Sequence, residues 1–352
     1  MTTRENILCA LRRKQPERVG YEFSLSPALL EEFKRRTGQQ DYSEHYDFPV
    51  RYLALHPTRL RTDFTRFFPS LPPGTRPLDW NPEWGVLGAP GATAHFQEML
   101  HPMAAFTTAD QVRDYPWPDF LADYRWAGAA KRVQALKDRD LVCAGFMQMT
   151  LFETAWYLRG MEEFMMDLMS GDEIATTLLD TLLEIRVGMA RRYAAAGVDV
   201  LMLGDDVATQ LTMMISPELW RATIKPRLAR VIQAAREVRP EIIIFYHGDG
   251  NMEAILPDLI EAGVEVLNPV QPECMDPVRI KQRFGDHLAF WGCLGTQTTM
   301  PFGSPEEVKR TVRELIATVG RGGGLFLAPT HTLEPDVPWA NVEAFLAAVS
   351  EQ

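Results

Sequence analysis

The second half of the chain alternates short apolar runs with long amphipathic stretches. The runs are rich in Val, Ile, Leu and Phe and are apolar throughout, which is typical of parallel strands covered by helices. They lie at residues 141–147, 198–203, 242–247, 264–270, 288–293 and 324–329. Similar runs at 19–24 and 49–55 complete a set of eight. The pattern therefore predicts eight buried parallel strands.

Helices are expected between these strands, near residues 162–196, 217–238, 251–262, 277–284, 304–319 and 340–350. Ser216 and Ser304 each precede a proline, and Ser304 also begins an S-x-x-E capping box. Gly197 and Gly263 separate a helix from the next strand, as helix C-caps do. Eight strand–helix units close naturally into a (β/α)8 TIM barrel of the α/β class. An open doubly wound sheet is the alternative, although no G-x-G-x-x-G follows a strand.

We expect one barrel domain over residues 1–352, with an N-terminal helical extension before the first strand. Residues 69–120 are dense in Pro and Gly and are predicted to form a long excursion over the surface. Its second part should be loop with one short helix, because Pro116 and Pro118 disfavour regular structure there.

Composition excludes several function classes. The 352 residues carry 36 basic and 47 acidic side chains, a net charge of −11, which disfavours nucleic acid as a partner. No run approaches the length of a membrane span, and the first residues lack the apolar core of a signal peptide, so we expect a cytoplasmic protein. The four cysteines form no C-x-x-C pair, which disfavours disulfide scaffolds and zinc ribbons.

Polar residues follow the apolar runs, at the strand ends where a barrel carries its active site. Because these residues come from different strands yet converge on one rim, they predict an enzyme. They are Glu22, Gln148, Asp205, Asp206, His247, Asp249, Asn268, Gln271, Cys293, Gln297, His331 and Glu334.

Two adjacent carboxylates end the strand at 198–203. Asp205 and Asp206 are candidates for a general acid/base or a substrate anchor, with a helix N-cap as the structural alternative. Consecutive side chains point to different sides, so one of the two should face the mouth, and we favour Asp205.

Two histidines and a carboxylate form a second set. His247 and Asp249 stand in a His-Gly-Asp-Gly turn, and His331 lies in the loop after the last strand. Together they make a plausible three-ligand metal site with open positions. A core histidine, a capping Asp and a surface histidine are the structural alternatives. Gln271 and Gln297 are candidates to hydrogen-bond a substrate, whereas Cys293 is predicted to be a buried, inert thiol.

Four segments carry a family resemblance, at residues 196–220, 245–273, 285–297 and 322–345. They resemble the uroporphyrinogen decarboxylase superfamily, which also includes zinc-dependent methyltransferases that act on corrinoid proteins and small thiols. The resemblance implies a single (β/α)8 barrel but not one particular reaction.

Two departures from the family pattern guide the choice of reaction. The decarboxylases carry an arginine-rich segment after the first strand, but residues 20–33 hold Glu22 and no arginine, which disfavours a substrate with many carboxylates. The methyltransferases hold zinc with His-x-Cys and a second cysteine, and the matching positions here are His247, Asp249 and His331. The resemblance therefore implies zinc or a harder divalent metal, with Glu22 as a candidate further ligand.

The expected protein is a methyltransferase or demethylase that moves a methyl group between a small methylated substrate and a corrinoid or thiol acceptor. A corrinoid would come with a partner protein, and family members are often homodimers. His247, Asp205 and His331 are the expected catalytic residues. The expected substrate contacts are Glu22, Gln148, Asp206, Gln271 and Gln297. The alternatives are a metal-independent decarboxylase or lyase acting on a small acid, and a non-catalytic ligand-binding barrel.

Overall fold

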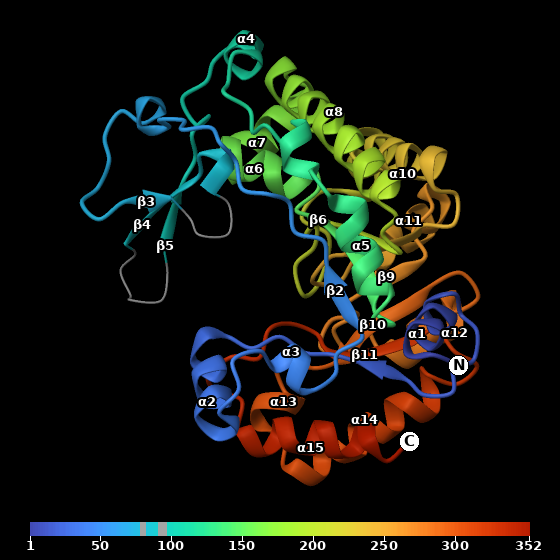
Figure 1. Ribbon diagram of the computed structural model, residues 1–352. Helices are drawn as coiled ribbons and strands as arrows, with labels where there is room; N and C mark the ends of the chain where they lie inside the picture. Colours follow the sequence, from blue (N-terminus) through green and yellow to red (C-terminus); the bar gives the residue numbers. More distant parts are fainter. Residues whose placement is uncertain (78–81, 91–96) are drawn as a thin grey trace.

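The computed structural model describes residues 1–77, 82–90 and 97–352 (Figure 1). Eight parallel strands form one curled sheet in the order β1-β11-β10-β9-β8-β7-β6-β2. This confirms the predicted α/β class and the eight strands of a (β/α)8 barrel. The strands are β1 (Gly20–Tyr21), β2 (Val50–Tyr52), β6 (Val142–Gln148), β7 (Val200–Gly204), β8 (Ile243–His247), β9 (Val266–Asn268), β10 (Ala289–Leu294) and β11 (Leu325–Pro329).

The two ends of the sheet meet through aromatic packing. Strands β1 and β2 form no ladder with each other among the residues that the structure describes. Phe48, just before β2, instead contacts Tyr21 of β1 at 5.7 Å and Phe23 at 4.9 Å between ring centroids. Edge-to-face aromatic pairs are favourable beyond their buried area. Packing between side chains therefore stabilises the contact between these two strands, which share no backbone ladder.

Alternate residues of each strand fill the barrel interior. Val142 and Ala144 of β6, Val200 and Met202 of β7, and Phe245 of β8 belong to one buried cluster with other interior residues. Ile7, Leu8 and Leu11 of helix α1 (Thr3–Leu11) join the same cluster. The predicted N-terminal extension therefore packs against the apolar interior of the barrel.

Helices follow the later strands as predicted, with some different boundaries. The stretch 162–196 is two helices, because Gly171 ends the first with a left-handed φ of 72°. The stretch 217–238 is divided at Ile224. Helices at 27–37, 42–45, 129–137, 152–159 and 299–302 were not predicted. No helix of the described chain is long and apolar enough to cross a membrane. The remaining helices are α2 (Pro27–Thr37), α3 (Tyr42–His45), α5 (Ala129–Lys137), α6 (Phe152–Arg159), α7 (Met161–Ser170), α8 (Glu173–Ala196), α9 (Pro217–Thr223), α10 (Lys225–Val238), α11 (Leu256–Ala262), α12 (Pro277–Phe284), α13 (Thr299–Phe302), α14 (Pro305–Thr318) and α15 (Trp339–Ser350).

The predicted helix caps are confirmed. Ser304 accepts from the backbone N–H of Glu307 and completes a reciprocal capping box, and Ser216 caps α9. Gly197 and Gly263 end their helices in the left-handed conformation, with φ of 89° and 107°. Local side-chain chemistry therefore determines where these helices begin and end.

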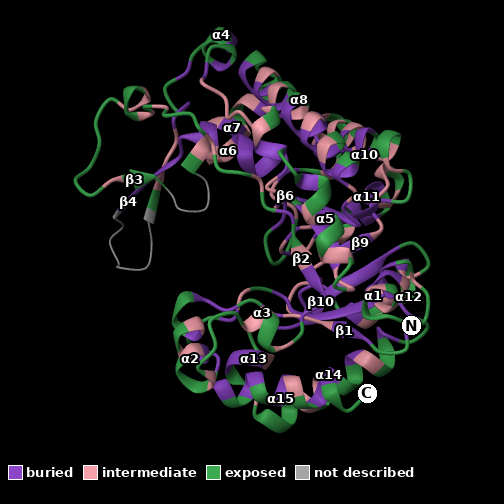
Figure 2. Ribbon diagram, in the orientation of Figure 1, coloured by how far each residue is buried: buried purple, intermediate pink, exposed green. Residues whose placement is uncertain are grey.

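The excursion at 69–120 contains more regular structure than predicted. Strands β3 (Arg76–Pro77), β4 (Leu87–Pro90) and β5 (Gln97–Leu100) form a small antiparallel sheet, and the short helix is α4 (Ala109–Arg113). The loop prediction was therefore wrong for these strands; residues 78–81 and 91–96 of the stretch lie outside the described residues. Figure 1 shows this sheet standing away from the barrel. Figure 2 shows that its base is buried, where Trp84 and Val86 pack into the main core.

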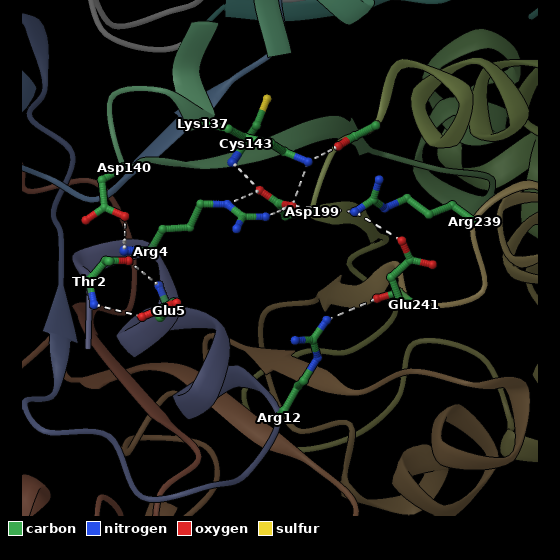
Figure 3. Close-up of polar contacts among 11 residues, drawn as sticks. Thr2, Arg4, Glu5, Arg12, Lys137, Asp140, Cys143, Asp199, Arg239 and Glu241 are labelled. Carbon is green, nitrogen blue, oxygen red and sulfur yellow. Dashed lines mark hydrogen bonds and ion pairs between the residues drawn. The ribbon is translucent and has the colours of Figure 1, made fainter. Parts of the chain in front are cut away.

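An ionic network joins the chain segments at the N-terminal ends of the strands (Figure 3). Asp199, just before β7, has a side chain only 2% exposed and pairs with Arg4 at 2.5 Å and Lys137 at 3.0 Å. It also accepts from the backbone N–H of Cys143 at 3.1 Å. These contacts hold the pKa of Asp199 below its usual value. The cluster ties α1 to β6 and β7, at the end of a barrel that contributes stability.

Candidate active site

A cavity of about 480 Å³ opens at the C-terminal ends of the strands. Its wall receives side chains from most of the barrel, including Glu22 of the β1 end, Gln148 of β6, His247 of β8, Asn268 of β9 and His331 after β11. The structure therefore brings these predicted site residues to one mouth, as barrel geometry requires. Five other predicted residues do not line this cavity: Asp205, Asp206, Asp249, Gln271 and Gln297.

His247 has one ring nitrogen committed to the neighbouring strand. Its Nδ1 lies 2.5 Å from Oδ1 of Asn268, whose Nδ2 donates to the carbonyl oxygen of Trp291 at 2.7 Å. A carbonyl can only accept, so the amide group of Asn268 must turn its oxygen toward His247. His247 therefore donates from Nδ1, and a neutral ring keeps the Nε2 lone pair available. Nε2 lies 3.6 Å from Oδ1 of Asp206.

Two carboxylates lie beside this histidine, and the three side chains together form a group of candidate metal ligands. One ligand atom each from Asp206, His247 and Asp249 lies within 4.8 Å of the other two. The backbone N–H of Asp249 donates to Oδ1 of Asp206 at 2.7 Å, and Oδ1 of Asp249 is buried without a hydrogen-bond partner. Burial and the charge of Asp206 raise the pKa of Asp249, while His247 opposes this shift. An orphaned carboxylate oxygen next to a second carboxylate and an imidazole is a donor set that suits a divalent cation.

The glycines of the His-Gly-Asp-Gly turn permit this approach. Gly250 has a left-handed φ of +86°, and a Cβ there would lie 2.4 Å from the carbonyl oxygen of Thr209. The turn after β8 can therefore contact the loop after β7 only without a side chain at this position. Gln271 fixes the same turn, because its buried Oε1 accepts from the backbone N–H of Gly250 at 2.7 Å. The structure thus places Gln271 behind the turn.

The two adjacent carboxylates have different surroundings. Oδ1 of Asp205 accepts from the backbone N–H groups of Leu151 and Glu153, both at 3.0 Å, at the start of α6. The side chain is buried, which raises the pKa of Asp205 to about 7 against the effect of these bonds. Asp205 therefore binds the N–H groups at the start of α6, which precedes it in the chain, whereas the structural alternative was a cap on the element that follows. Asp206, 37% exposed, is the member of the pair that joins the ligand group.

Glu153 is a site residue that the sequence did not reveal. Its Oε2 accepts from the backbone N–H of Asp206 at 2.9 Å, and its Oε1 accepts from the hydroxyl of Tyr157 at 2.8 Å. Burial and the charges of Asp206 and Asp205 raise the pKa of Glu153 to about 8. No sequence signal pointed to it, because the helix that carries it was not predicted.

Glu22 and His331 face the cavity outside the group of three. Glu22 accepts from Nε1 of Trp291 at 2.9 Å, and burial raises its pKa to about 7. His331 is exposed, and its charge lowers the pKa of Asp249. Gln297 is exposed and accepts from Gln210 at 2.7 Å, away from the cavity wall.

Arg51 lines the cavity although the sequence offered no reason to choose it. It is paired with Glu44 at 3.1 Å and donates to the carbonyl oxygens of Phe48 and Val50.

Cys293 is buried, and burial raises the pKa of its thiol to about 12, as expected for an inert cysteine.

Comparison with known proteins identifies relatives. The family model described as uroporphyrinogen decarboxylase (URO-D) matches residues 86–352. The chain is 28% identical over 173 residues to a methylcobamide:CoM methyltransferase (MtaA) from Methanosarcina barkeri, covering 49% of this chain and 48% of the relative. It is 25% identical over 174 residues to a uroporphyrinogen decarboxylase from Pseudomonas fluorescens, covering 49% of this chain and 47% of the relative. The chain thus spans about half the length of the curated relatives it matches.

A solved structure matches over the full length. A methyltransferase from Methanosarcina mazei superimposes with a TM-score of 0.68, covering 100% of this chain and 99% of that chain, at 19% identity. At this identity the likeness shows a shared fold.

Proposed function

Because the chain belongs to the uroporphyrinogen decarboxylase (URO-D) family, as its motifs predicted, we propose that it is a methyltransferase or demethylase of that family. The reaction would move a methyl group between a small methylated substrate and a corrinoid or thiol acceptor. Two relatives have names that support this choice over decarboxylation: the methylcobamide:CoM methyltransferase from Methanosarcina barkeri, and a methylated-thiol–coenzyme M methyltransferase from Methanosarcina mazei that is 25% identical over 204 residues. As the word methylcobamide in one of those names suggests, the corrinoid would come with a partner protein.

The grouping of Asp206, His247 and Asp249 is the observation that carries the proposal. These residues fit a divalent metal, because the buried Oδ1 of Asp249 has no other partner and Nε2 of His247 is kept available by Asn268. The set has one nitrogen and no sulfur, so it favours a harder ion than a thiolate site does, or holds zinc more weakly. When bound, such an ion would supply Lewis acidity that lowers the pKa of an acceptor group.

Residues around this group of three have supporting roles in the proposal. Asn268 orients His247, Gln271 holds the turn that carries Asp249, and Glu153 holds the backbone of Asp206. The carboxyl of Glu22 has its pKa raised to about 7, so it can hold or release a proton near neutral pH. His331 lines the same cavity and brings an imidazole to it.

The experiment is metal analysis of the protein purified without chelator. We expect about one equivalent of zinc or iron per chain, and its loss in His247→Ala and Asp249→Ala. His287→Ala is the matched control, because this histidine is exposed and lies outside the cavity wall. A protein without metal that keeps its activity in EDTA would contradict the proposal.

The second candidate is a metal-independent decarboxylase or lyase acting on a small acid. The shared cavity of Glu22 and His331 favours it, because it brings together an imidazole and a carboxyl whose pKa is raised to about 7, a combination that can act as general acid and base. Retained activity in EDTA together with loss in Glu22→Gln and His331→Ala would support this candidate. A non-catalytic barrel would bind ligands without turning them over.

A further inference from the structure

A second cavity of about 300 Å³ lies next to the first, and Gln148 lines both. It is lined by the excursion at Pro82–Trp84 and Phe120, by the end of strand β6 and by helix α8, and Leu55, Arg125 and Thr154 complete the wall. Apart from Gln148, the residues that line this second cavity do not line the first.

Arg186 of helix α8 places a buried positive charge in this wall. The residue is only 4% exposed, and its Nε and Nη2 donate to the carbonyl oxygens of Thr150 and Met149 at 2.9 and 2.7 Å. Nη2 also donates to Oγ1 of Thr154 at 3.1 Å, whereas the one partner of Nη1 among the described residues is the thioether sulfur of Met189 at 3.7 Å, a weak acceptor. No carboxylate of the described residues lies within ion-pair distance of this guanidinium; the buried carboxylate of Asp205 acts on it from farther away. Burial lowers the pKa of Arg186 to about 10 against the charge of Asp205, so the group is still charged at neutral pH.

The other guanidinium of the wall is already neutralised. Arg125 pairs with Glu83 through two bonds of 2.7 and 2.9 Å and with Asp119 at 2.8 Å. An incoming anion would therefore find its counter-charge at Arg186. A buried guanidinium with no oxygen acceptor for Nη1 can donate from that nitrogen to an anionic ligand.

The rest of the wall is largely aromatic. Trp84 lies 5.2 Å from the guanidinium of Arg186, measured to its ring, and Phe120, Phe146 and Tyr193 complete the apolar surface. Phe146 is 44% exposed although it belongs to a barrel strand. It contacts Tyr52 of the first cavity at 6.1 Å between ring centroids. Flat apolar surfaces left open beside a cation are suited to a planar ring that bears an anionic group.

We propose that the second cavity binds an aromatic carboxylate. The carboxylate meets Nη1 of Arg186, the ring packs against Trp84, Phe120 and Phe146, and the opposite edge of the ring points past Gln148 toward His247. This names the substrate class of the proposed function, and only the orientation toward His247 rests on that function. Binding itself depends on the second cavity alone.

Calorimetric titration of the full chain with benzoate tests the proposal. We expect one saturable site for benzoate, and at least about tenfold weaker binding of benzyl alcohol, which lacks the charge, and of acetate, which lacks the ring. Arg186→Met and Phe146→Ala should each weaken benzoate binding by about tenfold or more. Arg191→Met is the matched control, because this residue is on the same helix but pairs with Glu237 at the surface.

Several outcomes would overturn the proposal. These are no benzoate binding at millimolar concentration, equal binding of benzyl alcohol, or unchanged binding in Phe146→Ala. The last variant is included because Arg186 also holds the carbonyls of residues 149 and 150, so its removal can disturb folding. His247→Ala should leave benzoate binding within about twofold. Benzoate binding in a protein without metal would therefore uphold this site while the proposed metal function fails.

Discussion

Nδ1 of His247 donates to Oδ1 of Asn268 at 2.5 Å, and this bond decides which nitrogen of the ring faces Asp206. The two residues end neighbouring strands, β8 and β9, and stand opposite each other in the register of the sheet. The tautomer of the histidine is therefore set by strand pairing, and the remaining nitrogen is available where the carboxylates gather.

Replacing Asn268 should weaken the metal site without touching a ligand. In Asn268→Leu the acceptor for Nδ1 is gone, so the ring can rotate and protonate at either nitrogen; we expect metal affinity to fall by about 10- to 100-fold. Asn268→Asp keeps an acceptor and should retain most of the affinity. Competition with a chromogenic chelator measures both, and equal affinities of the Leu variant and the wild type would refute the role.

Asp205 and Asp206 should respond in opposite ways to truncation. Asp205→Ala leaves buried N–H groups at the start of α6 without an acceptor, so the free energy of unfolding should fall by about 1–3 kcal/mol. Asp206→Ala should change it by less than about 1 kcal/mol, because the side chain is half-buried, but should abolish metal binding. Urea denaturation and metal analysis of both variants check this, and the reversed pattern would contradict the assignment.

Adding a methyl group at Gly250 should separate the turn from the loop after β7. A Cβ there would overlap the carbonyl oxygen of Thr209 at 2.4 Å, so Gly250→Ala should cost about 2–3 kcal/mol and lower metal occupancy. Gly38→Ala is the control, because Gly38 has a similar φ of +71° but open space around it. It should cost about 1 kcal/mol and leave metal occupancy unchanged. Similar losses of stability and of metal occupancy in the two variants would show that backbone strain alone accounts for them, without the overlap with Thr209.

Glu22 should make the protein less stable as the pH rises. Its folded pKa is raised from 4.5 to about 7, so the folded state holds a proton that the unfolded state releases between these values. The free energy of unfolding should therefore decrease from about pH 4.5 to 7 through this group. Glu22→Gln should remove that slope and be more stable than the wild type at pH 8 by about 1–3 kcal/mol. Denaturation at several pH values in EDTA measures this, with the exposed Glu334→Gln as control.

Asp199 should contribute stability that is lost in acid. Asp199→Ala leaves Arg4 and Lys137 without their shared partner, so we expect a loss of about 3–5 kcal/mol at pH 7. Because its folded pKa is lowered, the wild-type advantage is present above the usual value of 3.8 and is lost as the pH falls through the folded value. Asp123→Ala is the control, since its pair with Arg192 is 96% exposed on the Asp side and should contribute under about 1 kcal/mol. Chemical denaturation at pH 7 and pH 3 compares the variants.

The choice between Asp205 and Asp206 shows where sequence reasoning ended. Strands that are apolar throughout do not reveal which alternate positions face the interior. The sequence therefore could not show which of the two carboxylates lies on the same side of the strand as the interior residues. In the structure Val200 and Met202 face the interior, Asp206 lies beside His247 and Asp249, and Asp205 points to the start of α6. The short strands of the excursion were missed for a related reason, because runs of two to four residues leave too little pattern to detect.

By itself the amino-acid sequence determined the eight strands, most of the helices between them, the caps at Ser216, Ser304, Gly197 and Gly263, and the family. These features depend on residues near one another in the chain, where apolar period and capping chemistry act locally. Only the tertiary structure decided that Asp206 joins His247 and Asp249, and that Glu153 stands behind them. It also decided that Arg186 is buried, with no carboxylate of the described residues within ion-pair distance. Distances between side chains on different strands depend on register and packing, which no local pattern encodes.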